Sequence, residues 1–286
     1  MDHNNFLIIK KNSNSKEGIE LIRENKKFFI LKKWKDEKRG LKSISKQINF
    51  EEIKIGSLII KSPEVYSTNL YKNKFEAKME YVEGSSGSDI SLIGSREISL
   101  KIKDSLSMLI NKNFENSTIK NINTSIFIKK IERIVSCVIG KTLIIERLDM
   151  IKKEFLKDKS LLIPIGPCHG DLTLSNIIIS RSGAINLIDF LPTFIESPLW
   201  DIVKIYQDLK YGWSYRYLSG PEKESAKIFF LSCIPKQFFL YEKFFKRQIN
   251  LLDALNLARI YPYLKDKETE LWINKFLDQS IKNLNE

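Results

Sequence analysis

Five residues between positions 169 and 189 are of types that could act together on a phosphate group. His169-Gly170-Asp171 is followed by Asn176, and Asp189 ends the next apolar segment. Carboxylate and carboxamide oxygens are ligands that Mg²⁺ prefers, and Mg²⁺ shares its coordination with substrate phosphates. A separate aspartate can accept the proton of an attacking hydroxyl. Each residue alone is common in turns, but the combination at this spacing favours phosphoryl-transfer chemistry.

A hairpin is predicted to bring two of these residues together. Short apolar strands lie on either side of Ser182-Gly183, a dipeptide that predicts a two-residue β-turn. In that register Asn176 is opposite Asp189, and directly opposed residues of an antiparallel pair lie about 5 Å apart. We therefore expect their oxygens to form a seat for Mg²⁺ at the open end of the hairpin, with Asp171 on the loop before it.

The elements around this segment change in character along the chain. Residues 1–83 are rich in strand patterns with one helical segment, whereas residues 84–286 are mainly helical. The predicted strands are 6–10, 18–23, 27–33, 57–61, 75–82, 177–180 and 184–188, and the predicted helices are 40–50, 96–113, 123–140, 146–157, 198–211, 221–233, 236–260 and 267–284. This order predicts the α+β class, with an N-terminal lobe of residues 1–83 and a C-terminal lobe of residues 84–286.

Three short segments carry a family resemblance. HGDLTLSN at residues 169–176 and IDF at 188–190 resemble the aminoglycoside phosphotransferase and choline kinase family, and MEYVEG at 79–84 resembles that family's connector between lobes. The resemblance covers most of the chain, although only the central motif is specific. It implies a protein-kinase-like two-lobed fold and the use of ATP with Mg²⁺.

The resemblance also implies roles for individual residues. Asp171 would be the catalytic base, and Asn176 and Asp189 would be the Mg²⁺ ligands. Backbone groups of Glu80 and Val82 would hold the adenine.

Two further residues are expected to support the catalytic loop. We expect His169 to brace the loop by packing and hydrogen bonding, not to act as the base. Asp201 resembles a family aspartate that steadies this loop, but a carboxylate in the first turn of a helix is an equally good reading.

The nucleotide-binding lysine has two candidates. Lys32 and Lys33 end the third strand on opposite faces, and Lys32 fits the family's strand better. The family's partner for this lysine is a glutamate of the first helix, but residues 40–50 contain none. Gln47 could substitute, or the partner could be Glu37 or Glu51.

Three further segments bear on substrate binding and on the kind of kinase, with weaker sequence evidence. No Gly-x-Gly-x-x-Gly loop is present, so residues 12–18 would have to cover the phosphates with backbone N–H groups. Leu191-Pro192 after Asp189-Phe190 argues against a mobile activation loop and hence against a regulated protein kinase. The aromatic cluster at 211–217 could form an acceptor pocket, but we favour the interpretation that these side chains pack within the C-terminal lobe.

Composition limits the other classes of function. The net charge of +12 comes from scattered lysines, which favours a solvated surface over a nucleic-acid interface. With only two histidines, the composition argues against a histidine-based metal site. Three cysteines far apart in the sequence, after an N-terminus without the pattern of a signal peptide, indicate reduced thiols in the cytoplasm. No apolar run is long enough for a membrane span.

These patterns predict an ATP- and Mg²⁺-dependent phosphotransferase that acts on a hydroxyl group of a small molecule. The acceptor could be a sugar, an amino alcohol such as choline, or an aminoglycoside. The alternative is a nucleotide-binding pseudokinase or scaffold without turnover, suggested by the missing helix glutamate.

Overall fold

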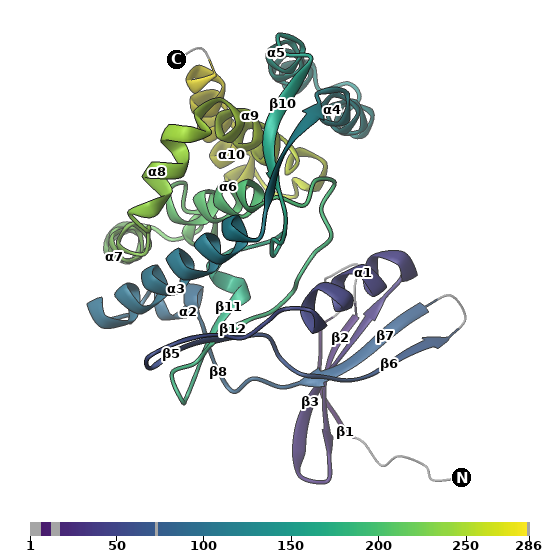
Figure 1. Cartoon of the computed structure of the whole chain (residues 1–286), viewed down its shortest axis with the longest axis vertical. Helices are drawn as coiled ribbons and strands as arrows, with labels where there is room; N and C mark the ends of the chain where they lie inside the picture. The colour runs from purple at the N-terminus through teal and green to yellow at the C-terminus, as the bar shows by residue number, and fades with distance from the viewer. Residues whose placement is uncertain (1–6, 13–17, 72–73, 285–286) are drawn as a thin grey trace. The chain divides into compact units, whose positions relative to one another are not determined.

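The computed structural model describes residues 7–12, 18–71 and 74–284 of the chain (Figure 1). It divides into two compact units. The first comprises Met1–Gly87, His169–Asp171 and Ser175–Phe194, and the second comprises Ser88–Cys168, Leu172–Leu174 and Ile195–Glu286. The segment with the candidate site thus packs with the N-terminal strands. A lobe boundary after residue 83 stays a prediction.

The predicted α+β class is confirmed, since strands dominate the N-terminal part and helices the C-terminal part. The elements of the first unit are β1 (Leu7–Asn12), β2 (Gly18–Glu24), β3 (Lys27–Trp34), α1 (Glu37–Ile48), β4 (Ile53–Ile55), β5 (Leu58–Lys61), β6 (Val65–Tyr71), β7 (Lys74–Glu80), β8 (Gly84–Ser86), β11 (Ile177–Ser180) and β12 (Ile185–Leu187). The sequence pattern indicates most of these elements but not β4, β6 or β8.

Two five-stranded sheets make up the first unit. One is antiparallel, with the order β1-β2-β3-β7-β6. The other has the order β4-β5-β12-β11-β8, in which only the β5–β12 pair is parallel. The second sheet joins the β11–β12 hairpin to strands that lie more than ninety residues earlier in the chain. This pairing positions the candidate site beside the N-terminal strands.

Helix α1 packs on the first sheet through only one of its regularly spaced apolar residues. Leu41, Ile44 and Ile48 have the spacing of an apolar helix face, but Leu41 and Ile48 are exposed. The buried positions are Gly40, Ser43, Ile44 and Gln47, of which only Ile44 is large and apolar. Ile44 joins a cluster with Trp34, Phe75, Ala77 and Met79.

The second unit is mainly helical. Its elements are α3 (Arg96–Glu115), β9 (Thr118–Asn123), α4 (Ser125–Cys137), α5 (Thr142–Leu156), β10 (Ser160–Ile165), α6 (Pro198–Leu209), α7 (Gly220–Ser232), α8 (Gln237–Phe244), α9 (Lys246–Ala258) and α10 (Lys267–Asn283), with short 3-10 helices at Trp213–Tyr215 and Tyr261–Tyr263. Helix α2 (Gly87–Ile90) and the 3-10 helix Leu174–Asn176 lie where the chain passes between units. Helix α6 is central, because every residue in it is buried and it contacts α3, α7 and α9.

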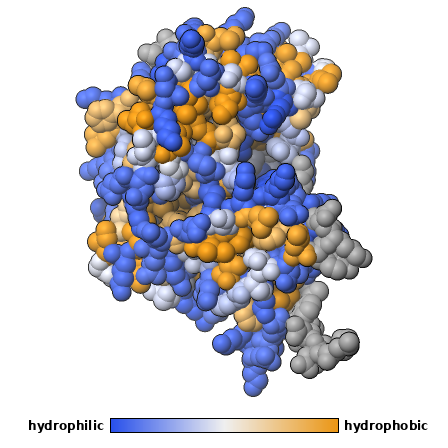
Figure 2. All heavy atoms as spheres, turned by 45° about the vertical axis from the view of Figure 1, so that its right-hand side comes forward, coloured by the Kyte–Doolittle hydropathy of each residue, from blue (hydrophilic) through white to orange (hydrophobic). Residues whose placement is uncertain are grey.

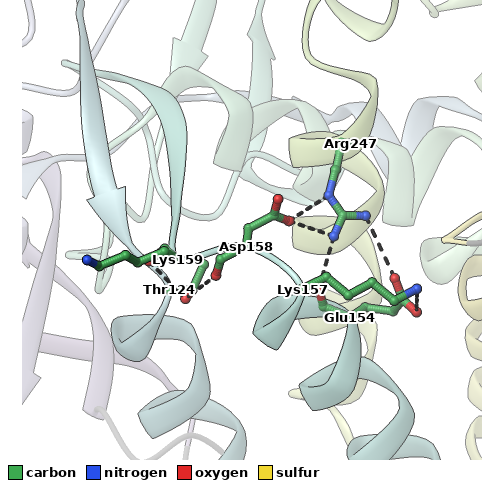
Figure 3. Close-up of polar contacts among 6 residues, drawn as sticks. All are labelled: Thr124, Glu154, Lys157, Asp158, Lys159 and Arg247. Atoms are coloured by element: carbon green, nitrogen blue, oxygen red, sulfur yellow. Dashed lines mark hydrogen bonds and ion pairs between the residues drawn. The ribbon is translucent and has the colours of Figure 1, made fainter.

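The antiparallel β9–β10 pair has no clear sequence signal, but charged side chains fix its surroundings (Figure 3). The Arg247 guanidinium donates to the Asp158 carboxylate at 2.7 Å and to the Glu154 carbonyl at 3.0 Å. The Thr124 hydroxyl donates to the Asp158 carbonyl at 2.8 Å. These contacts join α9 to the end of α5, and the end of α5 to the start of α4.

The helix predicted at residues 236–260 is two helices, α8 and α9. The break is at Phe245, where φ is −122° and ψ is 32°. Neither proline nor glycine marks this position. Its ring packs against Phe114 of α3, so tertiary packing accounts for the break better than local propensity does.

The surface mixes charged and apolar side chains, as the face drawn in Figure 2 shows. Within the described residues, no helix is both long and apolar enough to cross a membrane. The three cysteines have free thiols; Cys168 and Cys233 are buried, whereas Cys137 is exposed.

Candidate active site

The proposed base and one proposed metal ligand are joined directly. The Asn176 amide nitrogen donates to the Asp171 carbonyl at 2.8 Å and to its carboxylate Oδ2 at 3.2 Å. Because the nitrogen of Asn176 is used in this way, its carboxamide oxygen is the atom left to bind a cation. The short 3-10 helix Leu174–Asn176 makes this closure possible across only five residues.

The predicted hairpin is present, but its register differs by one residue. Asn176 is opposite Ile188, whose N–H donates to the Asn176 carbonyl at 3.0 Å, and is therefore not directly opposite Asp189. The reason is the loop, which has three residues: Gly183 donates to the Ser180 carbonyl at 2.8 Å and has a φ of 81°. A type I turn closed by a left-handed glycine is the usual three-residue hairpin loop.

Asp189 is held in an uncommon backbone conformation. Its φ is 61°, in the left-handed region that residues other than glycine rarely adopt. Its Oδ1 accepts a hydrogen bond from Lys32 Nζ at 2.9 Å. Among the described residues no contact occupies Oδ2, so this oxygen fits a hard cation. Backbone strain of this kind is concentrated at functional sites.

The two candidate lysines have different surroundings. Lys32 has a side chain that is 5% exposed and meets Asp189, whereas Lys33 is 41% exposed and pairs with Glu20 at 2.9 Å. Gln47 donates its amide nitrogen to the Pro63 carbonyl at 2.8 Å. This bond directs the Gln47 amide into the packing of α1 and away from the role of a glutamate substitute. The role of Lys32 toward a nucleotide stays a prediction.

The other predicted nucleotide contacts lie at the end of β7. Glu80 is the last residue of this strand, and its N–H donates to the Glu64 carbonyl at 2.8 Å. Val82 follows the strand, so its backbone groups lie outside the strand ladder. Most of the predicted phosphate-covering segment, residues 12–18, lies outside the described residues.

His169 braces the loop, as expected. Its Nε2 meets the Ile188 carbonyl at 2.8 Å, and its Nδ1 lies 3.2 Å from the Asp171 N–H. The ring packs on Phe190 with 4.4 Å between centroids. Because one ring nitrogen donates and the other accepts, this arrangement requires neutral imidazole. Burial lowers the pKa of His169 to about 4, in agreement with the geometry.

This brace should make stability depend on pH. Because the folded-state pKa of His169 lies below the value of about 6.5 in the unfolded chain, the unfolded state binds the extra proton. The contribution is complete above pH 6.5 and is lost as the pH falls toward 4. We expect urea unfolding to show a fall of up to about 3 kcal/mol across this window. In His169→Gln the histidine-specific slope should vanish. An unchanged slope in that variant would contradict the assignment.

A buried aspartate of α6 is a site residue that sequence reasoning missed. Asp208 is fully buried and accepts hydrogen bonds from the N–H groups of Leu174 at 2.7 Å and Ser214 at 2.9 Å. Burial raises its pKa, while these bonds and Lys204 act in the opposite direction. Asp208 therefore fixes the segment between Asp171 and Asn176. Asp208 is one of four polar residues on α6, with Asp201, Lys204 and Gln207, so its residue type alone does not single it out.

Asp201, the aspartate predicted to steady the loop, is also fully buried and lies in the first turn of α6. This position agrees with both interpretations of Asp201, as a residue that steadies the loop and as a carboxylate at the start of a helix. Its role toward the loop stays a prediction.

The aromatic cluster at residues 211–217 serves packing. Trp213 meets the Trp272 ring with 5.2 Å between centroids, and Tyr215 packs on Phe230 at 4.9 Å. The Arg216 guanidinium lies 3.8 Å from the Trp213 ring centroid. The protein's own cation thus takes the position over this ring that a cationic ligand would need.

The donor set suits a hard divalent cation shared with a substrate. No group of three or more His, Cys, Asp or Glu side chains that could hold a metal occurs in the described part of the chain. One carboxylate oxygen of Asp189 and the carboxamide oxygen of Asn176 provide two oxygen donors. Mg²⁺ typically takes one or two protein carboxylates and completes its shell with waters and substrate phosphates. The residues present therefore fit Mg²⁺ bound together with a nucleotide.

Solved structures with a similar fold cover nearly the whole chain. The apo form of a thermostable mutant of aminoglycoside phosphotransferase APH(4)-Ia has a TM-score of 0.63 and 10% identity, over 97% of this chain and 94% of that chain. A ternary complex of this enzyme with ADP and hygromycin B has a TM-score of 0.60 and 11% identity, over 96% and 94%. Choline kinase LicA from Streptococcus pneumoniae has a TM-score of 0.53 and 14% identity, over 96% and 94%.

The chain therefore has the kinase-like α+β fold of the aminoglycoside phosphotransferases and choline kinase LicA. The predicted fold class is confirmed, and so is the resemblance to these proteins at the level of the fold. No family model matches the sequence, and no curated protein matches it.

Proposed function

We propose that this protein is an ATP- and Mg²⁺-dependent phosphotransferase whose acceptor is a hydroxyl group of a small molecule. The observation that carries the proposal is the set of contacts within one compact unit: Asn176 bonds Asp171, and Lys32 pairs with Asp189. The fold supports it, because structures with this fold include complexes with ADP or AMP-PNP and hygromycin B. A choline kinase shares the fold as well.

The residues divide the chemistry between them. Asp171 accepts the proton as the acceptor oxygen bonds to the γ-phosphorus and the bond from that phosphorus to the ADP oxygen breaks. Asn176 and Asp189 would hold Mg²⁺, which offsets negative charge on the phosphates when bound. Lys32 lies beside Asp189 and supplies a second positive charge there. Val82 and Glu80 would contact the adenine through backbone groups.

Three acceptor classes follow from the resemblance: sugars, amino alcohols and aminoglycosides. The packing of Arg216 over Trp213 argues against this ring as the site for a cationic head group, because the guanidinium already lies over it.

Transfer of labelled γ-phosphate from ATP to a panel of these acceptors tests the proposal. We expect turnover with at least one class, loss of turnover when EDTA removes the metal, and recovery when Mg²⁺ is restored. Measurable Mg·ATP binding without turnover on the whole panel would instead support the pseudokinase alternative. The observation behind that alternative is the absence of a glutamate from residues 40–50, where the resemblance implies one.

Lys32 and Lys33 form a matched pair for a second test. Lys32→Met should raise the KM for ATP about tenfold or more, because a charge-assisted contact to phosphate contributes about 1.5–3 kcal/mol. Lys33→Met removes the same formal charge but lies beside Glu20, so its KM for ATP should change by no more than about twofold. Steady-state kinetics and thermal unfolding of both variants provide the comparison. The reverse order of effects would assign the nucleotide to Lys33.

A further inference from the structure

Helix α8 presents three large apolar side chains to solvent. Phe239 and Leu240 are each 57% exposed, and Phe244 is 75% exposed. At 100° per residue they fall within an arc of about 140° on one side of the helix. Single exposed apolar side chains are common on protein surfaces, but three that share one side of a short helix form a patch, and such patches mark interaction sites.

The opposite side of α8 is fixed to the second unit. Phe238 is fully buried, and the Tyr241 ring stacks on Phe114 with 3.8 Å between centroids. The Tyr241 hydroxyl also donates to Asn111 at 2.7 Å. Because these contacts hold the helix in one orientation, Phe239 and its neighbours cannot turn inward.

The same arc carries positive charge. Lys236 and Lys243 are exposed and lie between the apolar positions when the helix is viewed along its axis. Neither forms a salt bridge with any residue that the structure describes. The acid of this helix, Glu242, already pairs with Lys210. The arc therefore combines apolar side chains with uncompensated cations.

The charges decide which partner fits. Self-association through this face would bring lysines of two copies together in a desolvated interface. Because the face has no unpaired acid of its own helix, this arrangement would be unfavourable. A bilayer with anionic headgroups meets both requirements, because aromatic and leucine side chains enter the headgroup–acyl boundary while lysines reach the phosphates. The net charge of +12 adds long-range attraction to such a surface.

We propose that the exposed α8 face, formed by Phe239, Leu240, Phe244, Lys236 and Lys243, docks reversibly on anionic lipid membranes. Docking of this kind needs no membrane span and is independent of the phosphotransferase chemistry. It would place a small-molecule kinase at a lipid surface.

Flotation with lipid vesicles tests this proposal. The full-length protein should float with vesicles of phosphatidylglycerol and phosphatidylcholine in equal parts at physiological ionic strength, and weakly with phosphatidylcholine alone. The double variant Phe239→Ser/Phe244→Ser should reduce the partition coefficient about tenfold or more. Lys236→Gln/Lys243→Gln should reduce it about as much at low salt.

Matched controls separate the α8 face from general effects. Leu271→Ser changes a leucine of α10 that is 59% exposed, and Lys129→Gln/Lys141→Gln removes two exposed lysines elsewhere. Both controls should bind vesicles as the wild type does. Circular dichroism and thermal unfolding of every variant show whether the fold is retained.

Three outcomes would overturn the proposal. The first is equal binding to neutral and anionic vesicles, or no binding to either. The second is anionic binding that the α8 variants and the lysine control reduce alike, which would assign it to the overall charge. The third is a dimer in sedimentation velocity that Phe239→Ser/Phe244→Ser dissociates, which would assign the face to a second copy of the chain.

Discussion

Asp171→Asn should reduce kcat for phosphoryl transfer by a factor of about 10²–10⁴, the usual contribution of a general base. The substitution keeps the shape of the side chain and leaves an oxygen that can accept from Asn176, as Oδ2 does in the wild type at 3.2 Å. It removes only the carboxylate that takes the proton. The loss should therefore fall on kcat, while the affinity for Mg·ATP stays within about threefold of the wild type.

Single-turnover rates and calorimetric titration with Mg·ATP measure the two quantities separately. Asp149→Asn is the matched control, because Asp149 is exposed on α5 and is not part of the loop, and its activity should equal that of the wild type. A kcat near the wild-type value in Asp171→Asn would show that another group is the base. Loss of nucleotide affinity as well as kcat would show that the substitution disturbs the loop.

The existence of most elements could be predicted because burial imposes a period on the sequence. Helix α6 and strand β7 are predicted clearly, since α6 has apolar residues at helical spacing and β7 alternates between apolar and polar residues. Strands β9 and β10 do not, because a two-stranded pair with a mixed surface leaves little alternation. The break between α8 and α9 has no local cause at all, so only the packing of Phe245 could reveal it.

The site could be predicted as a set of residues but not as a geometry. The residues around Ser182-Gly183 are compatible with a hairpin loop of two residues and with one of three residues. The loop has three, and Asp189 is therefore not directly opposite Asn176. The left-handed backbone of Asp189 and its pairing with Lys32 depend on strands distant in sequence.

Hydrogen bonds of buried polar side chains could not be predicted from the sequence either. The side chain of Asp208 fixes backbone N–H groups that belong to two other segments. The periodicity of apolar residues does not predict a hydrogen bond between a side chain and the backbone of another segment. The fold is therefore more readable from this sequence than the contacts that complete its site.

Gly170→Ala should lower both the stability of the fold and the rate of phosphoryl transfer, whereas Asp171→Asn should lower only the rate. Gly170 has a φ of 89°, and an added Cβ would lie 2.1 Å from the Leu191 carbonyl oxygen and 3.0 Å from Thr193 Cγ2. The backbone conformation alone costs about 1–2 kcal/mol for a residue with a Cβ. The overlap adds about 1–3 kcal/mol or displaces the loop that carries Asp171. We expect the free energy of unfolding to fall by about 3 kcal/mol and phosphoryl transfer to fall at least a hundredfold.

Gly56→Ala separates the two costs. Gly56 also has a positive φ, 58°, but no atom lies within 4 Å of an added Cβ. It should lose only the backbone term of about 1–2 kcal/mol and keep its activity. Urea unfolding and the transfer assay, run on both variants, test this directly. If the two variants are equally stable and equally active, the close approach of Gly170 to Leu191 does not position the catalytic loop, and the support for Asp171 must come from His169 and Asp208 instead.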